Sequence, residues 1–217
     1  MELEPEDADS AKILANLLIG RAYTMLSDPA KRGAVKQLVE DALRYNPAES
    51  KAYVVMGKLA HEQRSYAIAV GYLQKAVALL PDFEDARRQL TKSRAALGYD
   101  CLLRKDLEGA ADAWTQCLAE AQEDFDGQVI TEQLQLLWGR FEAQGVASLK
   151  ADEVDEAIAA FRRCLQLDPE QHWAAWLLAT ALHRKPGSDP NELERLSRLA
   201  VAWQRRHQQD PGRACYL

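Results

Sequence analysis

Large and small residues recur along this chain at fixed distances from three glycines. Counting from Gly57, Gly98 and Gly145, a large residue follows after nine and sixteen positions, and a small residue after twelve and nineteen. Small residues let two antiparallel helices approach toward the short end of the usual ~8–10 Å axis separation, and the large ones fill the space beside the contact. In order of offset, the three sets are Tyr66, Ala69, Leu73 and Ala76; Leu107, Ala110, Trp114 and Cys117; and Val154, Ala157, Phe161 and Cys164.

Polar turns separate the two helices of each predicted pair. They lie at residues 63–65, 104–106 and 151–153, where polar side chains interrupt the apolar period. In the third turn we expect Asp152 to accept amide hydrogens of the following helix, whose first turn is acidic and suits the positive end of the helix dipole. Pro81 and Pro169 are expected to end two of the second helices, because proline cannot continue a helix.

This register of glycine, alanine, aromatic residue, small residue and proline resembles the tetratricopeptide repeat, whose period is 34 residues. Pro47 and Pro81 stand one such period apart, whereas the later glycines are 41 and 47 residues apart (98 − 57 and 145 − 98). We expect two elongated first helices, Glu84 to Arg104 and about Gln128 to Leu149, to account for the longer spacings. The resemblance implies an all-α fold: a right-handed superhelical solenoid of about five antiparallel helix pairs with a C-terminal capping helix.

The two ends of the array are less regular. A first helix is predicted from Asp9 or Ser10 to about Met25, and Gly20 resembles the repeat's glycine although its partner helix is offset by three residues. After Pro169, a helix over His172 to His183 and a capping helix from Asp189 complete the array. We expect a flexible acidic tail over residues 1–9 and a single domain over residues 10–217. The apolar stripe expected on the first helix is Ile13, Leu14, Leu17, Leu18 and Ala22.

Composition narrows the class of protein. Apolar residues make up 47% and charged residues 28%, which fits a folded, soluble chain. A net charge of −6 and a pI near 5.3 argue against binding of nucleic acid, which needs clustered positive charge. The start has no basic and apolar leader, and no apolar run approaches the ~18 residues of a membrane span, so we predict a cytoplasmic protein that does not bind membranes.

The sequence offers no candidate catalytic site. The four histidines are scattered, and no metal, nucleophile or phosphate-loop motif is present. Cys101, Cys117 and Cys164 fall at inward positions without metal-ligand spacing, so we expect small buried hydrophobic residues rather than disulfides or ligands. We therefore predict a protein that is not an enzyme and that needs no cofactor and no metal. An enzyme, or the regulatory subunit of one, is the least supported class.

The resemblance assigns partner binding to the concave groove lined by the first helices. It does not match the clamp with which some members of the family bind a C-terminal carboxylate, because Arg21, Val55 and Lys58 stand where the clamp has asparagines. The groove also includes Glu142, Leu149 and Thr180, and its apolar members could instead be packed against neighbouring repeats. The predicted partner-binding residues are Arg21, Lys51, Val54, Lys58, His61, Lys92, Tyr99, Leu102, Val146 and Trp176.

Two functions are compatible with these features. The first is a non-enzymatic adaptor or scaffold that binds a peptide or helix of another protein in the concave groove, basic in its N-terminal half and apolar further on. The alternative is a cytoplasmic chaperone for a secreted or assembling client protein. Association into a homodimer through the apolar ends of the array stays open.

Overall fold

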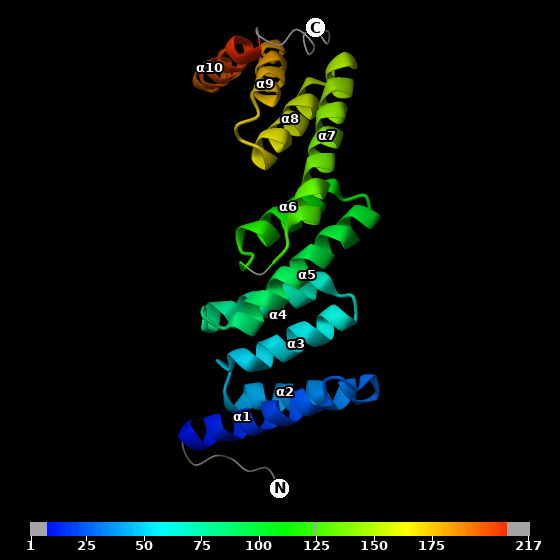
Figure 1. The fold of residues 1–217 in the computed structure, drawn as a ribbon, viewed down its shortest axis with the longest axis vertical. Coiled ribbons are helices and arrows are strands. Elements are labelled where there is room, and N and C mark those ends of the chain that lie inside the picture. Colours follow the sequence, from blue (N-terminus) through cyan, green and yellow to red (C-terminus); the bar gives the residue numbers. More distant parts are fainter. Residues whose placement is uncertain (1–7, 124, 208–217) are drawn as a thin grey trace. The chain divides into compact units, whose positions relative to one another are not determined.

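The computed structural model describes residues 8–123 and 125–207, with side chains up to residue 201. Within these ranges the chain forms ten α-helices, one short 3-10 helix and no strand (Figure 1). The elements are α1 (Ala8–Met25), η1 (Pro29–Lys31), α2 (Arg32–Tyr45), α3 (Ser50–Glu62), α4 (Tyr66–Leu79), α5 (Glu84–Leu103), α6 (Leu107–Ala119), α7 (Gln128–Lys150), α8 (Val154–Leu167), α9 (His172–Arg184) and α10 (Pro190–His207). The all-α prediction is confirmed, and so are the two elongated helices, α5 and α7.

The helices belong to two compact units. Unit 1 spans Met1–Ile130 and contains three helix pairs, α1–α2, α3–α4 and α5–α6. Unit 2 spans Thr131–Leu217 and contains two pairs, α7–α8 and α9–α10. The five predicted helix pairs are therefore present, three in one unit and two in the other.

In three of the helix pairs, the glycine of the first helix lies directly against a large side chain of the second helix. A Cβ atom added to Gly57, Gly98 or Gly145 would lie closer than 3.0 Å to the large residue sixteen positions later. Those residues, Leu73, Trp114 and Phe161, are 0% exposed. Glycine is required at these positions because a bulky side chain of the second helix occupies the place where a Cβ would stand. These contacts confirm the interpretation of the register.

The first pair follows the period but not the glycine. A Cβ on Gly20 would meet nothing within 4 Å, so Gly20 is not the contact glycine, and that expectation was wrong. One 34-residue period before Gly57 lies Tyr23 (57 − 34), and the residues twelve, sixteen and nineteen positions after it are 0% exposed (Val35, Val39 and Ala42). Tyr23 packs on the same cluster. In the first pair a bulky residue thus stands at the position of the glycine, and the smaller Val39 stands sixteen positions later, where the other three pairs have a larger side chain.

The buried stripe of α1 also differs from the expected one. Ile13 and Leu17 are 61% and 66% exposed, whereas Ala15, Ile19 and Ala22 are buried. Apolar residues surround most of this helix, so their periodicity alone did not indicate which side faces α2 and α3. Packing against those two helices selects the stripe that contains the two alanines, because small residues permit the closer approach.

Each of the three regular turns contains one residue in the left-handed region. Arg64, Lys105 and Asp152 have φ of 58°, 62° and 63°, and each stands seven positions after its glycine. The next amide closes a six-residue turn, as in the 2.9 Å bond from Asp106 N to Cys101 O. Asp152 is therefore the turn residue and not the cap that we expected. The N-cap is Glu153, whose side chain makes no capping bond.

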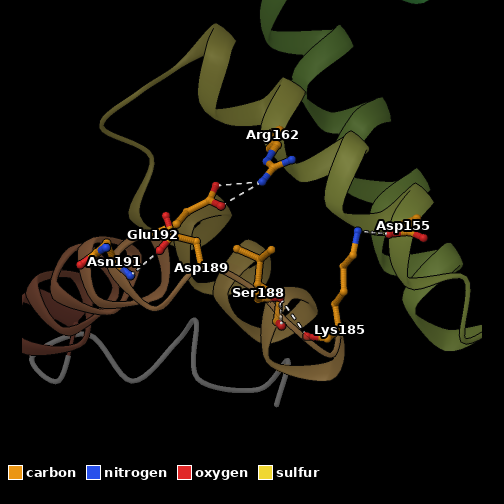
Figure 2. Close-up of polar contacts among 8 residues, drawn as sticks. Asp155, Arg162, Lys185, Ser188, Asp189, Asn191 and Glu192 are labelled. Atoms are coloured by element: carbon orange, nitrogen blue, oxygen red, sulfur yellow. Dashed lines mark hydrogen bonds and ion pairs between the residues drawn. The ribbon is translucent and has the colours of Figure 1, made fainter.

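The last pair is attached to α8 by side chains at both ends of the α9–α10 connection (Figure 2). Arg162 of α8 donates to both carboxylate oxygens of Glu192, at 3.0 and 2.9 Å. Lys185, just after α9, donates to Asp155 at 2.7 Å. As expected for a helix start, Asp189 accepts from the amide of Asn191 at 2.9 Å. These contacts fix where α10 begins relative to α8.

Candidate functional site

The first helices of unit 1, α1, α3 and α5, form one continuous face, called the unit 1 face below. Lys58 on α3 connects the three helices. Its Nζ donates to Asp85 Oδ2 of α5 at 2.8 Å and lies 5.2 Å from the centre of the Tyr23 ring of α1. Residues from the three first helices of unit 1 therefore meet on this face.

A hollow of about 340 Å³ opens on the unit 1 face. Its lining comes from the first helices and from Phe83, the residue immediately before α5, and no second helix contributes. Lys51 is the one lining residue among the predicted binding residues. Tyr23, which also lines the hollow, was not predicted. It could have been found from the sequence because it stands one 34-residue period before Gly57. The lining residues of this unit 1 hollow are Asn16, Ile19, Gly20, Tyr23, Lys51, Phe83 and Asp85.

Burial and nearby charges determine the protonation of the unit 1 face. Burial, helped by the negative charge of Asp85, raises the pKa of Tyr23 to about 12. Burial and the positive charge of Lys92 lower the pKa of His61, whose Nδ1 lies 3.0 Å from Ser93 Oγ. At neutral pH the face therefore presents a neutral phenol and a neutral imidazole beside its charged residues.

The predicted binding residues of unit 1 differ in their accessibility. Arg21, Lys51 and Lys92 are exposed, Lys58, His61 and Leu102 are half-buried, and Tyr99 is 39% exposed with its ring 5.0 Å from that of Trp114. Val54 is 0% exposed and packs in the core with Leu73, so it is not available to a partner and its inclusion was wrong. It was included because the resemblance places the residue three positions before the repeat's glycine on the groove face.

The first helices of unit 2, α7 and α9, carry a different set of side chains, called the unit 2 face. Trp173 Nε1 donates to Glu142 Oε1 at 2.6 Å. The ring of Trp173 stacks on that of Trp176, with centroids 5.0 Å apart and planes at 16°. Val146 and Trp176, both predicted binding residues, are half-buried and pack on the core cluster of this unit. The face thus combines two stacked indoles with a carboxylate.

A second hollow, of about 760 Å³, lies between α9 and α10. Trp176 belongs to both features, since it lines this hollow and stacks on Trp173. Because α10 was predicted only as a capping helix, its contribution to an open site was not foreseen. This unit 2 hollow is lined by Trp176, Ala179, Thr180, His183, Arg184, Pro190, Leu193, Glu194, Ser197, Ala200 and Val201.

The cysteines of the described residues are free and buried, as the sequence predicted. Burial raises the pKa of Cys117 to about 11 and that of Cys164 to about 12, so both thiols stay protonated at neutral pH. Cys215 lies outside the described residues. No three His, Cys, Asp or Glu residues in the described part come together as a metal site. None of the helices described there combines the length and apolarity needed to cross a membrane.

Comparison with known proteins gives only distant similarities. No protein-family model and no curated protein matches the chain. Among solved structures, MamA 41-end from Desulfovibrio magneticus RS-1 is 16% identical with a TM-score of 0.38, over 91% of this chain and 97% of that one. YrrB, described as a TPR protein with an unusual peptide-binding site, is 18% identical with a TM-score of 0.34, over 94% and 89%. PilF of Pseudomonas aeruginosa is 19% identical with a TM-score of 0.35, over 90% and 77%.

Superpositions of this quality carry no argument about function, so the repeat type rests on the helix pairs themselves. Three pairs place a glycine against the large residue sixteen positions later, and the same three share a left-handed turn residue seven positions after that glycine. A fourth pair keeps the 34-residue period with Tyr23 in place of the glycine. The chain therefore has a tetratricopeptide-repeat-like fold built from antiparallel helix pairs.

Proposed function

We propose that this protein is a non-enzymatic adaptor or scaffold whose first-helix faces bind a peptide or a helix of a partner protein. One observation carries the proposal: the unit 1 hollow is lined by first helices and by the residue preceding α5, and by no second helix. A repeat array that exposes an open site on the face shared by consecutive first helices offers a partner contacts from several repeats at once.

The chemistry of the unit 1 hollow suits a peptide. Its volume lies near the lower end of the roughly 300–1,000 Å³ typical of ligand sites, enough for one or two side chains. Ile19, Tyr23 and Phe83 supply apolar surface, while Asn16 and Lys51 supply polar groups that fix orientation. Around it, the proposed contacts in unit 1 are Arg21, Lys51, Lys58, His61, Lys92, Tyr99 and Leu102, and those in unit 2 are Val146 and Trp176.

Filling the unit 1 hollow tests the proposal. Gly20 lines it and has open space around its Cβ position, so Gly20→Leu places a side chain in the hollow without disturbing the core. Gly71→Leu on α4 is the matched control, because Gly71 is exposed on a second helix with equally open space. Peptides selected from a displayed library on the full chain should bind Gly20→Leu about tenfold more weakly, which corresponds to roughly 1.4 kcal/mol.

Two results would decide against the proposal. One is that no selected peptide binds the purified chain. The other is that binding is unaffected by Gly20→Leu and by substitutions on the unit 2 face, yet is lost in Gly71→Leu. A client that becomes soluble on co-expression without forming a stable complex would instead favour the chaperone alternative. The cytoplasmic location and the homodimer stay predictions from the sequence.

A further inference from the structure

The carboxylate of Glu142 occupies an unusual position on the unit 2 face. It is half-buried and accepts a 2.6 Å hydrogen bond from Trp173, yet no Lys, Arg or His among the described residues forms an ion pair with it. A partly desolvated carboxylate with one neutral donor is less well compensated than in water. A cation of a bound partner would supply the missing charge.

The two indoles beside Glu142 favour the same kind of ligand. The face of an indole ring carries negative electrostatic potential, and tryptophan is the strongest aromatic partner for a cation. The stacked rings of Trp173 and Trp176 hold a fixed orientation next to the carboxylate. A planar guanidinium group can donate hydrogen bonds to a carboxylate from its edge while its flat face stacks on an aromatic ring.

The charges beside the unit 2 hollow are engaged with other groups or distant from Trp176. Arg184 donates to the carbonyl of Leu149 at 3.2 Å and stands eight residues after Trp176, about 12 Å along the helix. Glu194, in the unit 2 hollow, pairs with Arg198 at 2.6 Å. His183 lies in the last turn of α9 beside Arg184, so it is also distant from Trp176 along the helix. None of these groups pairs with Glu142, so its charge stays available to a partner.

We infer that Glu142, Trp173 and Trp176 form a binding site for a basic side chain, arginine or lysine, of the partner segment. This inference rests on the proposed function and specifies the partner's chemistry at the unit 2 face. The guanidinium or ammonium group contacts the Glu142 carboxylate and the indole faces. Because Trp176 also lines the unit 2 hollow, an apolar residue next to the basic one enters the space between Trp176, Leu193 and Val201.

The test compares three synthetic peptides that differ at one position. Each has the form acetyl-Gly-Ser-Leu-X-Leu-Ser-Gly-amide, where X is arginine, citrulline or glutamate. Citrulline keeps the shape of arginine and removes its charge. With the full chain, we expect the arginine peptide to bind about tenfold more tightly than the citrulline peptide, because a charged hydrogen bond and a cation–π contact are lost together. The glutamate peptide should bind most weakly.

Two variants locate the preference. Glu142→Gln keeps an oxygen that accepts from Trp173 and removes the charge, so the arginine and citrulline peptides should bind it within about twofold of each other. Glu156→Gln removes the same charge from an exposed position on α8 and should leave the tenfold preference intact. Equal loss in both variants would assign the effect to the overall charge and overturn the inference.

The remaining outcomes separate the inference from the function on which it rests. Equal binding of the arginine and citrulline peptides to the unaltered chain overturns the inference. So does a preference for arginine that survives Glu142→Gln. If none of the three peptides binds while library-selected peptides still require an open unit 1 hollow, the inference fails and the proposed function stands. If no selected peptide binds either, both fail.

Discussion

The two first-helix faces are built from helix pairs of the same kind, but their charged side chains differ in whether they have an internal partner. On the unit 1 face, Lys58 is bound to Asp85 and lies near the ring of Tyr23, so a large part of its charge is already compensated. On the unit 2 face, Glu142 has an indole donor and no cation among the described residues. The presence of a charged residue at a groove position in the sequence thus does not show that its charge is available to a partner. Availability depends on whether the side chain already has an ion-pair partner inside the protein.

The glycine contact inside each unit gives the largest expected effect. Gly98→Ala in unit 1 and Gly145→Ala in unit 2 place a methyl group against Trp114 and Phe161, which are fully buried. Overpacking of this kind costs typically about 1–3 kcal/mol, and we expect a similar loss in the two units. Urea unfolding followed by far-ultraviolet circular dichroism measures it.

Gly20→Ala is the matched control for these substitutions. Its Cβ meets nothing within 4 Å, and alanine is favoured over glycine inside a helix by about 1 kcal/mol, so this variant should be more stable than the unaltered protein. A loss of stability in Gly20→Ala, or no loss in either of the other two, would show that the glycine contacts do not define the repeat.

The turn residues give a smaller effect, of opposite sign, in both units. Lys105 and Asp152 have φ of 62° and 63°, a conformation that costs a residue with a side chain about 1 kcal/mol and glycine almost nothing. Lys105→Gly and Asp152→Gly should therefore each raise the free energy of unfolding by up to about 1 kcal/mol, measured in the same urea experiment.

The control for the turn substitutions is Ala147→Gly, at an exposed position inside α7. There glycine has no conformational advantage, and stability should fall by about 1 kcal/mol. If the turn variants and the control lose stability alike, the left-handed turn is not the feature that joins the two helices.

The smallest expected effect is a pH dependence of the stability that comes from His61 on the unit 1 face. The pKa of His61 is lowered below 6.5 in the folded chain, by burial and by Lys92, so the unfolded chain takes up a proton more readily. The stability that His61 contributes is present above about pH 6.5 and is lost as pH falls through the lowered pKa. His61→Gln should decrease this loss, as thermal unfolding between pH 7 and about pH 5 would show. A loss of the same size in His61→Gln would exclude His61 as its source.

The agreement between sequence and structure can be traced to particular residues. Gly57, Gly98 and Gly145 could be recognised because small-to-large contacts at fixed offsets leave a mark on the sequence that few other arrangements produce. The first pair could not be recognised in the same way, because it has the bulky Tyr23 at the position of the glycine and the smaller Val39 at the position of the large residue. Val54 was misplaced because its offset from Gly57 alone does not show whether the side chain enters the core or lies on the open face.

The candidate sites required the tertiary structure for a related reason. Lys58 and Asp85 are 27 residues apart, and Glu142 and Trp173 are 31 apart, so each contact depends on how parallel first helices align. That alignment follows from how the second helix between them packs, and no short motif marks it.

The sequence by itself determined the helix pairs, their turns and the residues at which the helices of three pairs touch, since these depend on local periodicity and on volumes a fixed distance apart. Only the tertiary structure decided which charges are compensated, which side of α1 is buried and where the two hollows open. Those properties depend on side chains from helices distant in the sequence, and a change of one residue in the alignment of two helices would give each charge a different partner.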